Sequence, residues 1–328
     1  MAEPVAGTSG KVLGQIMRRN GWTVALYLLV GALLVSARLI SPTYGSTDVQ
    51  SLAIAVLPIA FAAAAQTVVV IGGGIDLSVG AMMAFTSVVA AVLMKGNGEA
   101  FAVVVVLGVL LLGASCGALN GSLIVLTRVP DIIVTLAMSF VWAGAALMVI
   151  NTPGGGAADW FKSLSSGSYL TEWMPRALVL LVVCIGVVWI PLRRSRLGLA
   201  IYAVGSDRVA ALRSGVDVRR TKVISYAITG LFAAMGGMAL TMTTGIGTPT
   251  AGPYTLAGVA AIVLGGVSLV GGRGGMAGPI AAAFILALIR SDLFFMGVDP
   301  NYSTVIQGIV LVIVVMIGGV VAMRRKRS

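Results

Sequence analysis

Histidine is absent from the 328 residues, and there are only two cysteines, Cys116 and Cys184, both inside apolar runs. Without histidine the chain lacks the commonest general base and the usual zinc ligand. Two cysteines at these places do not form a disulfide framework. No paired-carboxylate or metal-ligand cluster can be assembled, and no G-x-x-x-x-G-K-[ST] phosphate loop occurs. The sequence therefore predicts no catalytic residue, no metal site and no cofactor bound by this chain.

Charge is also scarce. Charged residues make up 10% of the chain, against roughly 25% in a soluble domain. Hydrophobic residues make up 58%, and the mean hydropathy is +1.04. The net charge of +11 does not indicate nucleic acid, because the basic residues stand at the ends of apolar runs, as on the cytoplasmic face of a membrane protein. The sequence predicts an all-helical integral membrane protein, one transmembrane domain over residues 1–328, in contact with lipid.

Ten apolar runs approach the roughly 20 residues that a spanning helix needs. The third and eighth runs are short, and the fourth is long enough to tilt or break. The predicted spans are 22–40, 52–71, 78–94, 101–126, 132–150, 176–192, 223–244, 254–270, 276–294 and 302–323.

The distribution of basic residues tests this count. With ten spans, 17 of the 22 lysines and arginines fall on one side of the membrane. By the positive-inside rule this side is the cytoplasm. Both termini are then cytoplasmic, namely the N-terminal segment 1–21 and the basic tail 324–328, and so is the long basic loop 193–222. The alternative for the first run is a cleaved signal peptide, because Val35-Ser36-Ala37 resembles a cleavage site.

Polar residues interrupt the apolar runs at a few places. Gly72-Gly73-Gly74 predicts a helix break, after which Asp76 or Ser78 can cap the following helix. An ionisable residue at membrane depth is also a functional candidate. Between 245 and 275, prolines and paired glycines predict broken or half-helices. The candidates for a substrate path are Gln66, Asp76, Ser78, Asn120, Thr250, Tyr254 and Thr255.

Glycines at every fourth position indicate close helix packing. Gly113, Gly117 and Gly121 lie on one face of a helix and allow another backbone to approach. The pattern leaves open whether that neighbour belongs to this chain or to another subunit.

Residues 206–215 of the basic loop predict a two-turn helix. Ser206 is the expected N-cap, Asp207 and Arg213 suit the helix dipole, and Gly215 suits the position after the last turn. Because so short a helix is unstable alone, it needs a surface, which is either a partner protein or anionic lipid. Its apolar side is formed by Val209, Ala210 and Leu212.

The largest external segment is predicted at 151–175. Its aromatic residues Trp160, Tyr169 and Trp173 suit the membrane interface. The alternative is a contact surface for an extracytoplasmic partner.

Four stretches together resemble a known family. GGGIDLSVGAMMAF (72–85), GALNG (117–121), YAVGSDRVAALRSGVDVRRTK (202–222) and PTAG…AAIVLGGVSLVGGRG (249–274) are similar to permease subunits of bacterial ABC importers for ribose, xylose, arabinose and galactose. The resemblance implies a bacterial inner-membrane subunit that works beside a second permease. It also implies an external solute-binding protein and two cytoplasmic ATPase domains, which bind the ATP and magnesium.

The resemblance further implies that the short helix between spans six and seven is a coupling helix seated in an ATPase groove. Six residues match the family's coupling-loop pattern: Gly205, Ser206, Ala210, Ser214, Gly215 and Val216. The residues expected to couple to the ATPase are Gly205, Ser206, Asp207, Arg208, Val209, Ala210, Leu212, Arg213, Ser214 and Gly215. The chain departs from the family at Arg208, where relatives often have glutamate. It also departs at Thr255 and Ala257, where acids are common, and at Asp131, where an apolar residue is usual. These departures weaken an assignment to ribose itself.

The predicted function is therefore the permease of an ATP-driven importer for a monosaccharide, a polyol or a related polar solute. Nucleosides, autoinducer-type furanoses and branched-chain amino acids stay open as solutes, and the second permease can be identical or merely related. A rival from another class is an ion-coupled secondary transporter. Such proteins place acids or histidines at the bilayer midplane, where Asp76 is the one obvious acid of this chain.

Overall fold

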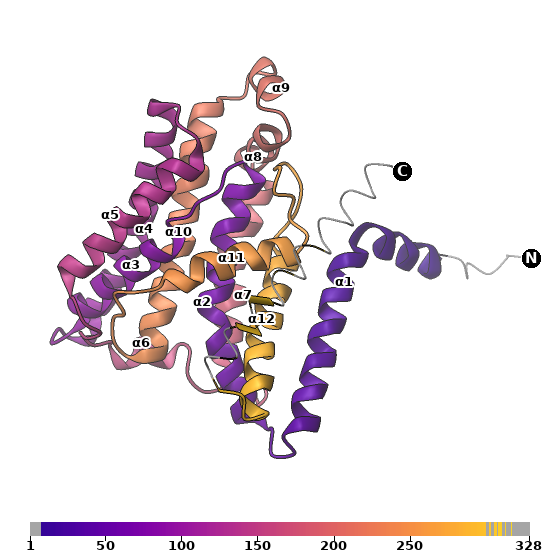
Figure 1. Ribbon diagram of the computed structural model, residues 1–328, viewed down its shortest axis with the longest axis vertical. Coiled ribbons are helices and arrows are strands. Elements are labelled where there is room, and N and C mark those ends of the chain that lie inside the picture. The colour runs from indigo at the N-terminus through magenta and orange to yellow at the C-terminus, as the bar shows by residue number, and fades with distance from the viewer. Residues whose placement is uncertain are drawn as a thin grey trace, which may run out of the picture.

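The computed structural model describes residues 8–299 and seven further positions, 302, 305, 306, 308, 309, 312 and 316, with side chains described from Gly21 onward. The described residues form twelve α-helices and no strand, which confirms the all-helical prediction (Figure 1). The helices are α1 (Thr8–Ile40), α2 (Ser46–Ile71), α3 (Val79–Met94), α4 (Glu99–Thr127), α5 (Asp131–Val149), α6 (Asp159–Ser163), α7 (Arg176–Arg194), α8 (Arg196–Ser206), α9 (Arg208–Arg213), α10 (Val218–Thr244), α11 (Gly252–Leu264) and α12 (Ala277–Phe295).

Seven of the described helices are long and apolar enough to cross a membrane. They are α2, α4, α5, α7, α10, α12 and the part of α1 from Gly21 to Ile40. Two shorter apolar helices, α3 and α11, correspond to the third and eighth predicted spans. The tenth predicted span, 302–323, and the tail 324–328 lie outside the continuously described residues.

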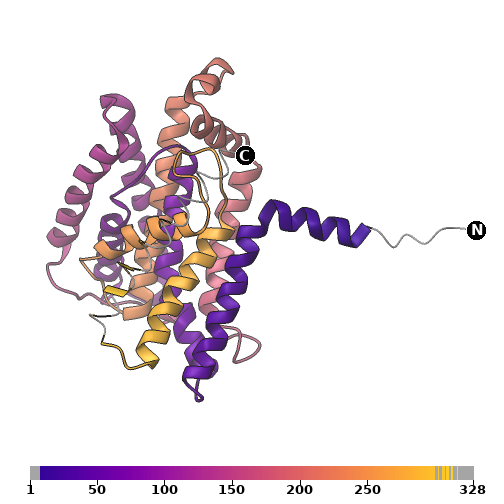
Figure 2. The same ribbon diagram turned by 45° about the vertical axis from the view of Figure 1, so that its right-hand side comes forward.

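The centre of the bundle is α2, with 83% of its apolar window buried. By contrast, the windows of α4, α5 and α7 are 33% buried or less, so these helices present wide apolar faces outward. Helix α10 packs along α4, α2 and α3, while α1 lies against α12 (Figure 1). The N-terminal part of α1 turns away from the bundle (Figure 2).

The predicted glycine face of α4 packs against α10 of the same chain. A Cβ atom added at Gly113 would lie 2.6 Å from the carbonyl oxygen of Gly230, and one at Gly121 would lie 2.9 Å from Cβ of Tyr226. At Gly117 it would overlap the carbonyl oxygen of Tyr226. The question that the spacing left open is therefore answered, because the close neighbour is intramolecular.

Two helix breaks place irregular backbone inside the protein. Helix α2 ends at Ile71 and α3 begins at Val79, which confirms the predicted break at 72–78. The predicted span 254–270 is wrong in extent, because α11 ends at Leu264 and Gly266 follows with φ +77°. At 13 residues α11 is too short to cross a membrane. Figure 1 shows α11 lying across the long axis that its neighbours follow.

The basic segment 193–222 is not the loop that its charge suggested. Helix α7 continues to Arg194, α8 and α9 follow, and α10 already begins at Val218. The sequence analysis did not predict α8, because the many arginines of the segment made it appear to be a solvent-exposed loop. Gly198, Ile201 and Val204 are buried, and the side chain of Ser195 accepts from the Gly198 N–H at 3.1 Å as an N-cap.

Helix α9 and helix α6 lie at opposite ends of the molecule (Figure 1). The ends of α2, α4 and α7 and the starts of α5 and α10 lie near the α9 end (Figure 1). Segment 151–175, which contains α6, closes the other end. The bundle therefore has two distinct polar ends separated by apolar helices.

Candidate functional site: a buried polar network and an exposed basic helix

A hydrogen-bonded network surrounds the break between α2 and α3. The Asp76 carboxylate accepts through Oδ1 from the Ser78 backbone N–H at 2.8 Å and from the Ser78 hydroxyl at 2.6 Å. Asn120 on α4 donates through Nδ2 to the Ser78 hydroxyl oxygen at 2.8 Å, and Trp142 on α5 donates to Asn120 Oδ1 at 3.2 Å. Asp76, Ser78 and Asn120 are fully buried, so the network joins three elements away from solvent.

Two oxygens of this network are free. Gln66 on α2 donates through Nε2 to the Asp76 carbonyl oxygen at 2.6 Å. Among the residues that the structure describes, Gln66 Oε1 and Asp76 Oδ2 are buried and have no hydrogen-bond partner. Leaving a buried acceptor unpaired costs about 1–3 kcal/mol, so such groups require an explanation. Both can accept a hydrogen bond from a hydroxyl group that enters the network.

The expected capping of α3 takes a different form. Ser78 is the N-cap residue, but its side chain makes no capping bond, and Asp76 bonds to the N–H of Ser78 itself. The free N–H of Gly80 in the first turn is satisfied instead by Thr255 of α11, whose Oγ1 accepts at 2.8 Å. The prediction that Asp76 or Ser78 caps α3 is therefore wrong, because tertiary packing supplies the acceptor.

The structure brings together four of the seven path candidates. Gln66, Asp76, Ser78 and Asn120 share the network, and Thr255 holds the adjacent turn of α3. Thr250 is exposed and Tyr254 is half-buried, and no described hydrogen bond joins either to the network.

The sequence reading missed Trp142 and Thr135 of α5, which also hold this region. Thr135 Oγ1 accepts from the Leu77 N–H at 3.1 Å. Each is a single polar group in an apolar run, which carries no signal in the sequence.

An ion pair lies beside the same break. Lys222 Nζ is 2.7 Å from Asp131 Oδ1, and the two side chains are 16% and 14% exposed. Tyr226 donates its hydroxyl to Asp131 Oδ2 at 2.9 Å. Asp131 therefore has two partners on α10.

Helix α9 lies at one end of the bundle, between α8 and α10, and part of its apolar side is exposed. Ala211 is buried against Val204 and Val218, whereas Val209 and Leu212 are 59% and 63% exposed. The predicted apolar side thus faces outward.

The ends of α9 correct one prediction and confirm another. Asp207 is the N-cap, accepting from the Val209 and Ala210 N–H groups at 2.8 and 3.0 Å. The predicted N-cap Ser206 is wrong, because α8 continues through it. Gly215 has φ +83°, as expected of the residue that ends this helix.

The charge around α9 is positive and uncompensated. Among the described residues, no acid lies within ion-pair distance of Arg208, Arg213, Arg219 or Arg220. The surface therefore combines exposed apolar side chains with exposed guanidinium groups, which suits an acidic protein surface.

Comparison with known proteins places these features in a family. Residues 49–315 match the model of the branched-chain amino acid transport system / permease component. The chain belongs to this permease family. The permease is therefore a transport subunit and not an enzyme, and it is a multi-pass membrane protein.

Several relatives carry the names of solute importers. The ribose import permease protein RbsC of Escherichia coli strain K12 is 34% identical over 79% of this permease and 81% of its own length. The fructose import permease protein FrcC of Rhizobium meliloti is 33% identical over 77% and 72%. The autoinducer 2 import system permease protein LsrD of Escherichia coli O157:H7 is 29% identical over 94% and 95%. No solved structure matches.

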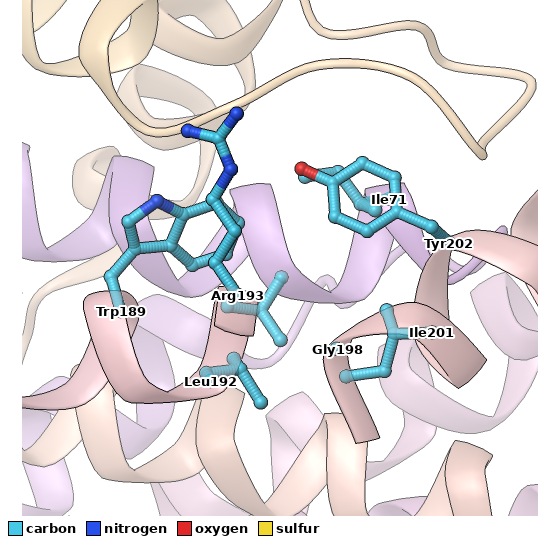
Figure 3. Close-up of a pocket in the computed structure, with 8 residues that line it drawn as sticks. Ile71, Trp189, Leu192, Arg193, Gly198, Ile201 and Tyr202 are labelled. Carbon is cyan, nitrogen blue, oxygen red and sulfur yellow. The ribbon is translucent and has the colours of Figure 1, made fainter. Parts of the chain in front are cut away.

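A small cleft of the permease lies between α2, α7 and α8, apart from the polar network. Figure 3 shows Trp189 and Arg193 of α7 facing Tyr202 of α8 across it. The remaining lining residues are almost all apolar: Val68, Ile71, Leu192, Gly198 and Ile201. Its polar groups come only from Trp189, Arg193 and Tyr202, and all of these are donors or hydroxyls. The buried network differs in holding two acceptor oxygens without a partner, which makes it the candidate for solute contact.

Proposed function

We propose that this permease is the membrane-spanning subunit of an ATP-driven importer for a monosaccharide, a polyol or a related polar solute. The names of the relatives, which refer to ribose, fructose and autoinducer 2, support this solute class. The free oxygens of Gln66 and Asp76 support it as well, since solutes rich in hydroxyl groups supply the donors that these acceptors lack.

The proposed assembly contains a second permease subunit, two ATPase domains that bind ATP and magnesium, and an external solute-binding protein. In the bacterial inner membrane, the α9 end faces the cytoplasm. Between residues 21 and 299, ten basic residues lie toward this end, against five toward the other: Arg38, Lys95, Lys162, Arg176 and Arg290. The positive-inside rule supports this orientation. Segment 151–175 then faces the binding protein, with exposed Tyr169 and Trp173.

Transport in this proposal works by displacement. Closure of the ATPases moves α9, and the bundle changes between inward-open and outward-open states. The ATPases drive the change because they bind the two states with different affinity.

The observation that carries the proposal is the exposed apolar side of α9. The double variant Val209→Asp with Leu212→Asp places two carboxylates on this side, which should abolish ATPase assembly and transport. The measurement is co-purification of the ATPase with the permease, followed by uptake in proteoliposomes. Leu170→Asp is the control for co-purification of the ATPase alone, because Leu170 is 91% exposed in the segment at the opposite end, away from α9. Normal recovery of the complex from the double variant would refute the docking role.

Solute choice is tested with the complete importer. The permease is reconstituted with its ATPase and with the binding protein encoded beside it, and uptake of labelled ribose, fructose, a nucleoside and leucine is compared. We expect ATP-dependent uptake of a sugar. Uptake of leucine alone would contradict the proposed solute class.

Autoinducer 2 is the second candidate solute. It is favoured by the extent of the match to LsrD, which covers 94% of the permease, whereas the match to the ribose permease covers 79%. Thermal-shift screening of the binding protein separates the two, since only the true ligand raises its melting temperature.

A further inference from the structure

Three segments that are far apart in the sequence meet backbone to backbone at the end of α8. Gly272 donates its N–H to the carbonyl oxygen of Ile71, the last residue of α2, at 2.9 Å. A Cβ atom added at Gly205 would lie 2.7 Å from the Gly272 nitrogen and nearer still to the Ile71 carbonyl oxygen. Figure 1 shows α8, the end of α2 and the loop after α11 together at the α9 end of the molecule. We name Gly73, Gly205, Gly271 and Gly272 the glycine junction.

The backbones at the glycine junction are packed too closely to admit any side chain. A Cβ atom at Gly271 would lie 2.7 Å from the Gly205 carbonyl oxygen and 2.9 Å from the Cα atom of Gly73. Gly73, Gly271 and Gly272 have φ of +75°, +96° and +67°, which other residues rarely adopt. With no side chain between the backbones, the end of α8 cannot move toward α2 or toward the 271–272 loop without displacing them.

The glycine junction lies between α9 and the polar network, and it is connected to each of them by a short segment of the backbone. On one side, Gly205 is followed by Ser206 and by Asp207, the N-cap of α9. On the other side, Gly73 is followed by Gly74, Ile75 and Asp76.

The segment from Gly73 to Asp76 is also held from its other side. A Cβ atom at Gly74 would lie 2.6 Å from Asp131 Oδ2 and 2.8 Å from the Tyr226 hydroxyl oxygen. Tyr226 also donates to the Ile75 carbonyl oxygen at 3.4 Å. Because α5 and α10 confine the segment here, a push from α8 is directed along it toward Asp76.

We propose that the glycine junction transmits displacement of α9 to the network at Asp76, and that Gly205 is the positioning residue through which it passes. This rests on the proposed function only in that the ATPase acts on α9. Opening of the solute path and closure of the ATPases are then linked through backbone contact at one point.

The test is Gly205→Ala in the reconstituted importer. The added methyl group separates α8 from Ile71, so we expect an assembled complex that still hydrolyses ATP, with uptake per ATP reduced by about tenfold or more. Gly275→Ala is the matched control, since no atom lies within 4 Å of its added Cβ, and it should transport like the unmodified permease. Full uptake by Gly205→Ala would overturn the proposal.

A milder variant tests the proposed transmission if the Gly205→Ala permease does not assemble with its ATPase. Tyr202 of α8 donates its hydroxyl to the Gly274 carbonyl oxygen at 2.8 Å, which ties α8 to the 271–275 loop. Tyr202→Phe removes only this bond, so its thermal stability and ATPase binding should be unchanged while uptake per ATP falls. An unchanged uptake per ATP in Tyr202→Phe would overturn the proposal, because α8 would then act on the path without its tie to the 271–275 loop.

The two proposals fail in different ways. If α9 does not dock the ATPase, the Val209→Asp, Leu212→Asp permease assembles normally. If the glycine junction does not transmit the displacement of α9, the double variant still loses its ATPase. In that case Gly205→Ala and Tyr202→Phe both transport normally.

Discussion

The ion pair between Lys222 and Asp131 lies at the boundary between the basic segment and the apolar bundle. Removing one partner of a largely buried pair leaves the other charge uncompensated, which is far more costly than removing both. The Tyr226 hydroxyl donates to the same carboxylate, so loss of Asp131 would also leave this hydroxyl without its partner.

Lys222→Met and Asp131→Asn should therefore each destabilise the permease by on the order of 3 kcal/mol, because each leaves the other charge without its partner. The exchange Lys222→Asp with Asp131→Lys should recover much of the loss. Thermal unfolding of the purified permease measures both effects. The exposed pair Lys162–Asp159 is the control, and Lys162→Met should leave the unfolding temperature unchanged. No recovery in the exchanged variant would contradict a direct electrostatic link.

Asp76 offers a variant that separates a structural role from contact with the solute. The side-chain amide of the Asp76→Asn variant keeps an Oδ1 that can accept both bonds from Ser78, but it replaces the free Oδ2 by an NH₂ group that donates. If Oδ2 accepts from the solute, uptake should fall about tenfold or more, as expected when a buried polar contact becomes mismatched. The unfolding temperature should stay close to that of the unmodified permease. Unchanged uptake would restrict Asp76 to holding the helix break.

At the scale of the elements, α4 and α10 approach closely because glycines face each other. In lipid there is no hydrophobic driving force between helices, so close van der Waals contact holds such pairs together. Gly117 and Gly230 meet backbone atoms of the opposite helix, and neither backbone can move aside locally.

Gly117→Ala should therefore destabilise the permease by about 1–3 kcal/mol through overpacking. The control is Gly108→Ala on the same helix, which has no atom within 4 Å of the added Cβ and should be neutral or stabilising, because alanine favours the helix. Thermal unfolding of both variants, made in parallel, gives the comparison. Equal behaviour of the two would show that the glycine face does not determine packing.

At the scale of the whole molecule, the two ends carry different chemistry. The α9 end holds most of the arginines and the exposed helix α9, and the opposite end holds segment 151–175 with its exposed aromatic residues. In the proposed function, such a subunit depends on an ATPase at the α9 end for its energy and on a binding protein at the other end for its solute.

The purified permease alone in liposomes should therefore transport nothing under a proton or sodium gradient, and uptake should begin only when ATPase, ATP and binding protein are added. Radiolabelled solute uptake measures this. Gradient-driven uptake by the lone permease would support the secondary transporter and contradict the ATP-driven importer.

The positions of the long helices followed from the sequence, because about 20 apolar residues in a row have few alternatives in a membrane. The helix break at 72–78, a half-helix between 245 and 275 and the residue Gly215 that follows α9 were predicted and confirmed. Helix α8, the end of α11 and the N-cap of α9 were not, because each depends on which residues find a packing partner.

Composition and pattern alone thus determined the membrane class, the helical architecture, the short helix in the basic segment and the family resemblance, since all of these are local properties of the chain. Only the tertiary structure decided that Gln66, Asp76, Ser78 and Asn120 share one network, that Asp131 pairs with Lys222, and that Gly205 touches Ile71. These contacts join residues up to 134 positions apart, as between Ile71 and Gly205, and no local pattern encodes which distant backbones meet.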